Sequence, residues 1–244
     1  MMLNNVEVRR NTEPKKNENV GATEVKKKTN RLNSYSLTSI RLSNSAVILA
    51  GGFSRRFGSD KSLVTLLDKP LIMHVIDRVS PLVNEVLLVI SSETQKQKFE
   101  PIINHKAKMV IDKYESQSPL VGAITGFETA KGEHSLLLPC DTPLISKKIA
   151  QLLLDMCTNR SAAIPRWPNG YIEPLQAVYR TKSALTAAKT ALAQGNRNMQ
   201  SMIDNLNGVR YVSTIVLEQL EPNMSTFFNV NTPQDLKKAE SMLT

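Results

Sequence analysis

Three of the ten glycines in this 244-residue chain fall within eight residues of one another, and three cations share the same stretch. The stretch Leu49–Lys61 contains Gly51, Gly52, Gly58, Arg55, Arg56 and Lys61. Glycines let a backbone turn sharply and approach a phosphate chain, and exposed N–H groups then bind its oxygens. Two adjacent glycines alone would favour an ordinary strand-to-helix turn with solvated cations. The glycines and cations together, directly after an apolar run, indicate a phosphate site.

Two familiar phosphate-binding patterns do not fit this stretch. A P-loop ends in Gly-Lys-Ser/Thr, but Gly58 is followed by Ser-Asp-Lys. The dinucleotide fingerprint requires Gly-x-Gly-x-x-Gly, and the spacing of Gly51, Gly52 and Gly58 does not match it. The residues therefore predict a phosphate-binding loop of another type.

Two aspartates follow apolar runs that are expected to be strands. Asp141 comes shortly after the run 135–138, and Asp112 directly follows the run 109–111. A carboxylate at such a strand end is well placed to hold Mg²⁺, which takes one or two carboxylates plus phosphate oxygens and water. An aspartate in these contexts is also typical of a turn or a helix cap, and for Asp141 the residues alone favour that structural interpretation.

The remaining polar candidates are weaker. Near the C-terminus, Thr232 is placed to cap a helix whose first residue is Pro233. The three histidines are scattered without metal-ligand spacing. Two cysteines exclude a disulfide scaffold, and both Cys140 and Cys157 are interpreted as packed residues. Trp167, in a proline-rich loop, either lines a ligand pocket or is an ordinary loop aromatic.

Short apolar runs alternate with helical patterns from residue 45 onward. Strands are expected at residues 46–50, 85–90, 109–111, 135–138, 162–164, 175–179, 209–213 and 227–230. Helices are expected at 71–79, 119–131, 146–156, 181–193 and 199–205, and from 233. This alternation predicts an α/β fold, a mostly parallel central sheet in a three-layer, Rossmann-like arrangement. Ligands bind at the carboxyl ends of such strands, so the glycine-rich stretch, the two aspartates and the segment 229–231 after the last predicted strand are expected to converge.

The net charge of +9 is unevenly distributed along the chain. The first 45 residues hold nine basic and four acidic residues, a balance of +5, which leaves +4 for the other 199. We predict a disordered basic extension over residues 1–44 and a single domain over 45–244. The folded part is not basic enough for a nucleic-acid-binding module. No apolar run is long enough to span a membrane and no secretory signal is evident, so a cytoplasmic protein is expected.

The glycine-rich stretch resembles the signature loop of the molybdenum cofactor guanylyltransferases, the MobA family, which reads roughly L-A-G-G-x-S-x-R-M/F-G-x-D-K. The matching residues are Leu49, Ala50, Gly51, Gly52, Ser54, Arg56, Phe57, Gly58, Asp60 and Lys61. The segment 140–143 is similar to the family's metal-binding C-D-x-P, and 228–236 to its F-x-N-x-N-T-P-x-D-L. The segment 118–122 stands in place of a G-P-L-x-G, with Ser118 where the first glycine is expected. The segment 173–175 resembles one near the family's pterin-side pocket.

The resemblance covers residues 45–244 in matching order and implies a nucleotidyltransferase fold. It implies a Mg²⁺-dependent transfer of GMP from GTP to the terminal phosphate of molybdopterin, with release of pyrophosphate. Lys61 and Arg56 would act in catalysis. The nucleotide would be bound by Leu49, Ala50, Gly51, Gly52, Lys61, Asp112 and Asp141. Asp141 would hold Mg²⁺, while Asn229 and Asn231 would face the pterin side, with Asn231 touching metal or phosphate.

The implied partners are GTP and molybdopterin as substrates, and molybdoenzyme apoproteins or molybdenum-insertion proteins, without nucleic acid or membrane. One alternative is another Mg²⁺-dependent nucleotidyltransferase, such as a cytidylyltransferase acting on molybdopterin or on a different phosphate acceptor. The base is selected by pocket details near Leu49 and Asp112 that the sequence does not specify. A second alternative is a non-catalytic carrier of a nucleotide or pterin, but a carrier needs neither Lys61 nor Asp141.

Overall fold

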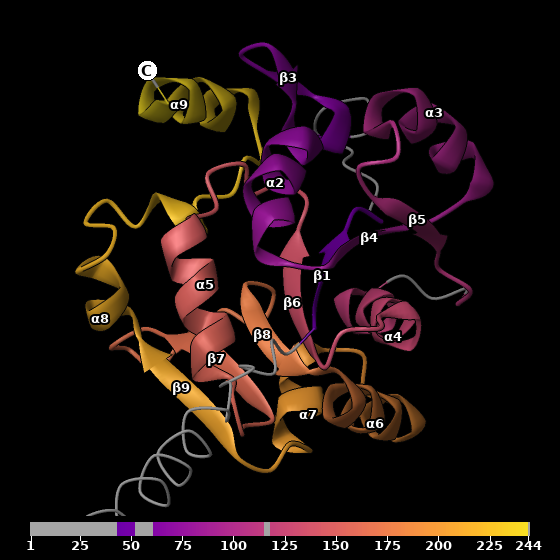
Figure 1. The fold of residues 1–244 in the computed structure, drawn as a ribbon, viewed down its shortest axis with the longest axis vertical. Coiled ribbons are helices and arrows are strands. Elements are labelled where there is room, and N and C mark those ends of the chain that lie inside the picture. Colours follow the sequence, from indigo (N-terminus) through magenta and orange to yellow (C-terminus); the bar gives the residue numbers. More distant parts are fainter. Residues whose placement is uncertain (1–42, 52–60, 115–117, 244) are drawn as a thin grey trace, which may run out of the picture. The chain divides into compact units, whose positions relative to one another are not determined.

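The central sheet of this protein is mostly parallel, as the sequence predicts. The computed structural model describes residues 43–51, 61–114 and 118–243, so the predicted extension 1–44 lies almost entirely outside it. In this described part, seven strands form one sheet in the order β5-β4-β1-β6-β8-β7-β9 (Figure 1). They are β1 (Asn44–Leu49), β4 (Glu85–Ile90), β5 (Lys108–Ile111), β6 (His134–Pro139), β7 (Ala162–Arg166), β8 (Ala177–Arg180) and β9 (Val209–Ser213). Within this sheet only β8 runs antiparallel to its neighbours.

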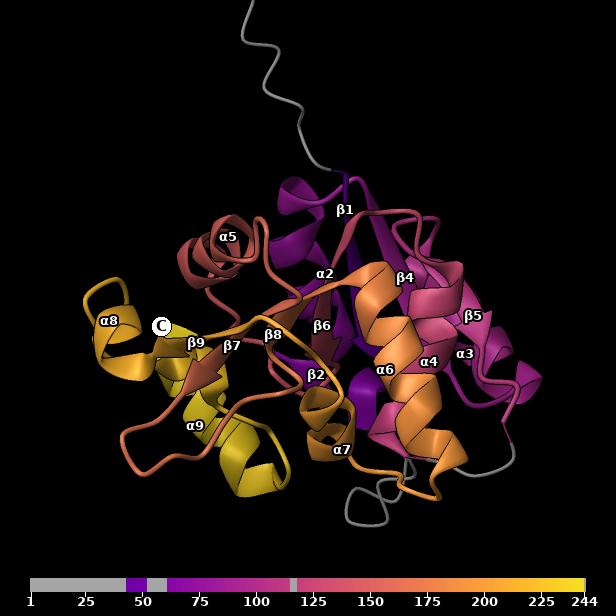
Figure 2. The same ribbon diagram turned by 90° about the horizontal axis from the view of Figure 1, so that it is seen from below.

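Helices cover both faces of the sheet, which confirms the three-layer prediction. They are α2 (Leu71–Val79), α3 (Glu93–Ile103), α4 (Pro119–Thr129), α5 (Lys147–Met156), α6 (Thr181–Ala193), α7 (Met199–Asp204) and α8 (Thr214–Glu218). The last helix, α9 (Pro233–Leu243), packs in a separate small core with Leu66 and Leu71. The buried side chains of α2, α3, α5 and α8 share one core with the sheet. Those of α4, α6 and α7 form the core on the opposite face, where α4 and α6 lie side by side (Figure 2).

Strand β1 lies at the point where the direction of the chain through the sheet reverses. The chain passes from β1 to β4 and β5 on one side, and then places β6 on the other side of β1. In open α/β sheets, ligands bind outside the carboxyl ends of the strands at such a switch point. The residues that follow β1 and β6 therefore occupy the position where a ligand is expected.

One predicted strand, at residues 227–230, is wrong. Residues Ser225–Phe227 form a turn of 3₁₀ helix, and the backbone beyond them is extended without joining a sheet. Val230 N–H donates to Asp141 O at 2.9 Å, which is an isolated contact and not part of a strand ladder. The predicted strand at 175–179 begins two residues late, at Ala177, because Gln176 N–H donates to Glu173 O in a turn.

Helix α3 and the short hairpin of β2 (Thr65–Leu66) and β3 (Lys69–Pro70) were not predicted from the sequence. The segment that forms α3 is polar and has Pro101 in its last turn, which weakens the helical pattern. The helix is fixed at its start, where Ser92 Oγ accepts from Gln95 N–H at 3.1 Å. This Ser-x-x-Gln spacing is a helix-start signal that was present in the sequence.

Helix α4 packs unusually close to β1 because it carries Gly126 at the contact. A Cβ built on Gly126 would overlap the side chain of Val47, a fully buried residue of β1. The nearby Gly122 is less constrained, since the nearest atom to its Cβ would be Leu49 Cδ2, at 3.3 Å, and the next ones lie 3.9 Å away. The glycine at 126 therefore sets the distance between the helix layer and the strand that leads into the site.

We expect Gly126→Ala to destabilise the protein by about 1–3 kcal/mol, because the added methyl group overpacks the α4–β1 contact. Gly122→Ala is the matched control on the same helix. The Leu49 side chain next to Gly122 is flexible and can move, and alanine favours a helix more than glycine does. Gly122→Ala should therefore change the free energy of unfolding by no more than about 1 kcal/mol. Urea unfolding of both variants measures the difference. Equal stabilities would contradict the packing argument.

Candidate active site

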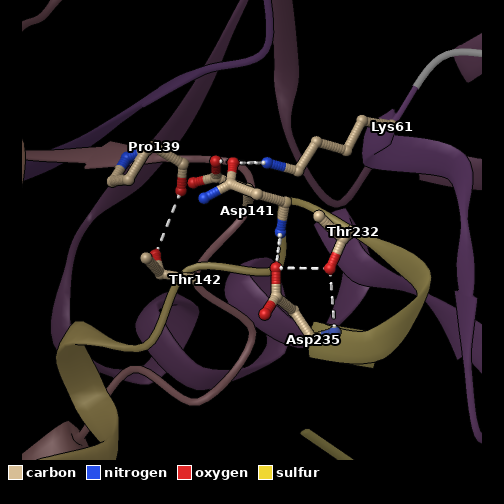
Figure 3. Close-up of polar contacts among 7 residues, drawn as sticks. Lys61, Pro139, Asp141, Thr142, Thr232 and Asp235 are labelled. Carbon is tan, nitrogen blue, oxygen red and sulfur yellow. Dashed lines mark hydrogen bonds and ion pairs between the residues drawn. The ribbon is translucent and has the colours of Figure 1, made fainter. Parts of the chain in front are cut away.

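Lys61 and Asp141 meet at the carboxyl end of the sheet (Figure 3), and Asn231 joins them there. Lys61 Nζ lies 2.7 Å from Asp141 Oδ2 and donates to Asn231 Oδ1 at 2.5 Å. The lysine comes from the 3₁₀ turn Lys61–Leu63, the aspartate follows β6, and the asparagine precedes α9. Three segments far apart in the sequence thus place one cation, one anion and one amide together.

Lys61 is held by the structure that follows it. Val64 N–H donates to Lys61 O at 3.1 Å, and Leu71 N–H donates to Val64 O at 2.9 Å, so the turn is tied to the start of α2. The β2–β3 hairpin is fixed by His74, whose Nε2 donates to Leu66 O at 2.9 Å. His74 is 8% exposed, so it is a packed structural residue.

Asp141 is held through backbone contacts on both sides. Cys140 N–H donates to Leu49 O at 3.1 Å, which joins the segment before Asp141 to the end of β1. Asp141 O accepts from Val230 N–H at 2.9 Å, which brings the C-terminal segment against it. The helix-cap role belongs instead to Ser146, whose Oγ accepts from Ile149 N–H at the start of α5. Of the two structural interpretations of Asp141, the structure therefore agrees with the turn and not with the cap.

Asn231 is fixed by the start of α9, where the predicted helix cap is confirmed. Asp235 N–H donates to Thr232 Oγ1 at 3.2 Å, and Pro233 is the first residue of the helix. Asp235 Oδ2 in turn accepts from Thr232 Oγ1 at 2.9 Å and from Asn231 N–H at 3.0 Å (Figure 3). The hydrogen bonds from the Thr232 hydroxyl and the Asn231 amide lower the pKa of the Asp235 carboxyl.

The Lys61–Asp141 pair is largely shielded from water. The exposed fraction is 12% for the Lys61 side chain and 22% for that of Asp141. In this setting an ion pair is screened less by salt than one on the surface, and removing one partner leaves the other charge poorly compensated. An ammonium has three N–H donors, and the contacts to Asp141 and Asn231 engage two of them.

The second carboxylate oxygen of Asp141 suits a metal ligand. Asp141 Oδ1 is buried and lacks a hydrogen-bond partner among the described residues. An unpartnered buried carboxylate oxygen is costly unless a ligand completes it. Across the described residues there is no cluster of three histidine, cysteine or acidic side chains that could hold an ion by themselves. A single carboxylate completed by phosphate oxygens and water fits Mg²⁺, which favours that ligand set.

Asp112 lies on the far side of the site from Asp141. It follows β5, and three strand spacings of ~4.8 Å separate β5 from β6, so the two carboxylates cannot share one ion. Asp112 Oδ1 accepts from Thr125 Oγ1 at 2.8 Å and from Tyr114 N–H at 3.2 Å. The residue thus fastens α4 to the end of β5, and its predicted role in nucleotide binding remains a prediction.

Ser118, which replaces an expected glycine, needs no special backbone conformation. Its φ of −153° and ψ of 159° are extended, and its Oγ accepts from Val121 N–H at 3.3 Å. The serine is therefore an ordinary N-cap of α4, a role that serine performs better than glycine.

Two of the predicted site residues, Gly52 and Arg56, lie outside the described residues, together with the rest of the stretch 52–60. The strand end that leads into the stretch is described. Leu49 is half-buried against the α4 side of the sheet, Ala50 is buried, and Gly51 is exposed. Asn229 is also exposed, one residue before the buried Val230.

The side chains of Trp167, Glu173 and Phe227 form a cluster next to the C-terminal segment that the sequence indicates only weakly. Trp167 Nε1 donates to Glu173 Oε1 at 2.8 Å, and the Trp167 ring packs edge-on against Phe227, with ring centroids 5.6 Å apart. Burial raises the pKa of the Glu173 carboxyl, an effect that the indole hydrogen bond partly opposes. The tryptophan is thus packed, and it joins the loop between β7 and β8 to the segment that leads to Asn229.

The thiol of Cys157 lies in the core and is not suited to chemistry. Cys157 is fully buried, and burial raises the pKa of its thiol to about 12. A thiol in this state is a poor nucleophile. Neither Cys140 nor Cys157 forms a disulfide within the described residues, which agrees with their interpretation as packed residues.

Comparison with known proteins identifies the family of this chain. The family model described as "MobA-like NTP transferase domain" matches residues 46–209, about two thirds of the chain. The chain belongs to the MobA-like NTP transferase family. The matched range includes Lys61 and Asp141. Asn231 lies beyond the matched range and still contacts Lys61.

Individual relatives agree with the family assignment. A protein of Methanosarcina mazei named "Probable molybdenum cofactor guanylyltransferase" is 30% identical over 198 residues, which cover 79% of this chain and 88% of that one. The crystal structure of molybdopterin-guanine dinucleotide biosynthesis protein A from Archaeoglobus fulgidus matches with a TM-score of 0.69 and 28% identity, over 82% of this chain and 98% of that one. The 4-diphosphocytidyl-2C-methyl-D-erythritol synthase of Anaerococcus prevotii matches over 82% of this chain and 98% of that one, with a TM-score of 0.63. At 14% identity, that last likeness shows the fold alone.

We expect Lys61→Ala and Asp141→Asn each to lower the nucleotidyl-transfer rate by about 10²–10³-fold, because each removes charge from where the phosphates react. Both proteins should remain folded by circular dichroism. Lys106→Ala is the control, since it removes a lysine whose ion pair with Asp77 is exposed, and it should leave the rate within about twofold. Normal turnover in either site variant would contradict these roles.

The raised pKa of Glu173 predicts a pH effect on stability. The folded protein retains this proton to higher pH than the unfolded chain, so the contribution of Glu173 to stability falls as pH rises from the usual glutamate range through the folded pKa. Glu173→Gln keeps an acceptor for the indole and removes the titration. Its unfolding free energy should therefore rise relative to the wild type between pH 4 and pH 7. The exposed Glu218→Gln is the control, and the same pH trend in both variants would contradict the assignment.

Proposed function

We propose that this chain is a molybdenum cofactor guanylyltransferase, which transfers GMP from GTP to the terminal phosphate of molybdopterin and releases pyrophosphate. The observation that carries the proposal is the convergence of Lys61, Asp141 and Asn231 at the switch point of the sheet. The M. mazei and A. fulgidus relatives carry names from this biosynthetic step and support the choice of substrates.

The reaction needs no protein nucleophile. An oxygen of the molybdopterin phosphate is already nucleophilic, and it forms a bond to the α-phosphorus of GTP while the bond from that phosphorus to the β-phosphate oxygen breaks. The electrons of the broken bond leave with pyrophosphate. Catalysis of such a step consists of positioning the two phosphates and stabilising the charge that develops on them.

Lys61 is the described residue best placed to stabilise that charge. Its ammonium is held by Asp141 and Asn231 at the end of β6, next to the strand that leads into the glycine-rich stretch, so it is ordered before substrate arrives. Pre-ordered charge is effective because little reorganisation is needed at the moment of reaction. We assign Arg56 to the same task, and main-chain groups of 49–52 to nucleotide binding.

Asp141 provides the metal site in this proposal. Its Oδ1 would hold Mg²⁺ while Oδ2 keeps the contact to Lys61. When bound, the ion would neutralise phosphate charge and polarise the phosphorus that is attacked. This family of enzymes generally uses a divalent metal, and the donor set at Asp141 supports the choice of magnesium.

The other predicted residues divide between the two substrates. We assign Asp112, three strands from β6, to the nucleoside end of GTP. We assign Asn229 to the molybdopterin side, because it is exposed and lies next to Asn231. Asn231 orients Lys61 and contacts phosphate or metal.

The proposed substrates support a cytoplasmic setting. No helix in the described part of the chain has the length and apolar character to cross a bilayer. Apoproteins of molybdoenzymes, or proteins that insert molybdenum, would exchange substrate and product with this chain.

The test is a nucleotide-selection assay. Purified full-length protein with Mg²⁺ and molybdopterin is given GTP, CTP, ATP or UTP separately, and pyrophosphate release is measured. We expect release with GTP at a rate at least tenfold above that with the other nucleotides. Release with CTP alone would instead identify a cytidylyltransferase, and no release with any nucleotide would favour a carrier.

A further inference from the structure

Gln95, in the first turn of α3, is a buried side chain that bonds to two neighbouring strand ends. Its exposed fraction is 8%. Its Nε2 donates to Ala50 O at 2.9 Å, directly after β1. Its Oε1 accepts from Ser91 N–H at 2.7 Å and from Ser91 Oγ at 3.0 Å, directly after β4. One amide side chain therefore joins the two strands where the glycine-rich stretch begins.

The position of this amide is set by the strand ladder. Leu49 pairs with Val89, and Ala50 N–H donates to Val89 O at 2.8 Å, which is the last backbone bond between these strand ends in the described residues. In a parallel ladder the next bond would run from Ser91 N–H to Ala50 O. Gln95 binds both of these groups. Its side chain thus takes the place of the next ladder bond and holds the two strand ends apart.

This arrangement determines the direction of the first peptide of the glycine-rich stretch. The C=O of Ala50 points toward β4, where Gln95 holds it. Because the C=O and N–H of a trans peptide point in opposite directions, the N–H of Gly51 points toward β6. Leu49 O points the same way, since it accepts from Cys140 N–H at 3.1 Å. The Gly51 N–H therefore faces the strand end that carries Asp141.

We propose that Gln95 is a positioning residue for nucleotide binding. By holding Ala50 O, it fixes the Ala50–Gly51 peptide so that the Gly51 N–H can donate to an oxygen of the nucleoside triphosphate beside the end of β6. The proposal rests on the nucleotidyltransferase function given above and adds to it a buried residue from a separate helix.

Glutamine is suited to this position because it has both a donor and an acceptor. Gln95→Glu keeps the length of the side chain and the acceptor for Ser91 N–H, but it removes the donor for Ala50 O. Gln95→Met keeps the length and removes both. Gln95→Glu is the more informative variant, because the start of α3 keeps its contact with Ser91 and the fold is disturbed least.

The experiment measures GTP binding to the full-length protein by isothermal titration calorimetry, followed by steady-state kinetics. We expect Gln95→Glu to bind GTP about tenfold more weakly. In the kinetics, the KM for GTP should rise accordingly, while the KM for molybdopterin should stay nearly unchanged. Gln95→Met should bind at least as weakly. Phe99→Leu is the matched control, since Phe99 is fully buried on the same helix and packs in the core; it should lower stability without changing GTP affinity.

The outcomes separate this proposal from the proposed function. Wild-type affinity for GTP in Gln95→Glu would overturn the positioning role, as would an equal loss of affinity in Phe99→Leu. A wild-type protein that binds no nucleoside triphosphate would instead overturn the proposed function, and the role of Gln95 with it.

Discussion

The contact between Lys61 and Asp141 is the interaction on which the candidate site depends. The two residues are 80 positions apart in the chain, and Asn231, which also binds the lysine, is a further 90 positions on. An ion pair this well shielded persists only if each partner is held independently. The 3₁₀ turn and hairpin hold the lysine, the end of β6 holds the aspartate, and the cap of α9 holds the asparagine. Much of the fold around the site therefore serves to hold these three segments in fixed positions relative to one another.

Strand β1 is shaped by two contacts, one along its length and one at its end. On the helix side, Gly126 allows α4 to approach the strand closely, which keeps the core beneath the site dense. At the end of the strand, Gln95 prevents the ladder with β4 from continuing. Strand β1 is thus packed against α4 along its length, while its hydrogen bonds to the end of β4 pass through the side chain of Gln95. Both effects come from residues outside the loop.

The fold by itself does not identify the chemistry. A cytidylyl-type synthase with 14% identity shares the sheet and its layers, and function on such a scaffold depends on the groups at the strand ends. In this chain the groups include a C-terminal asparagine that lies outside the range of the family model but contacts the central lysine. The buried Asp141 Oδ1, without a partner in the described residues, adds a feature that a purely structural ion pair would not need.

The sequence by itself determined the buried strands, the candidate carboxylate and the cap of α9, because each depends on neighbouring residues. Continuous apolar runs indicate β1, β4 and β6, and Thr232 followed by Pro233 indicates the start of a helix. The apolar segment 227–230 misled for the same reason, since a strand also needs a partner edge that no local pattern supplies. Helix α3 is not evident from its polar sequence, because its stability comes from Phe99 and Ile103, which pack against residues that are far away in the chain. Only the tertiary structure decided the order of the strands, because that order is set by contacts between residues far apart in the chain. This order brings Lys61, Asp141 and Asn231, which the sequence places at one end of the sheet, into direct contact, and it places Gln95 between two strand ends.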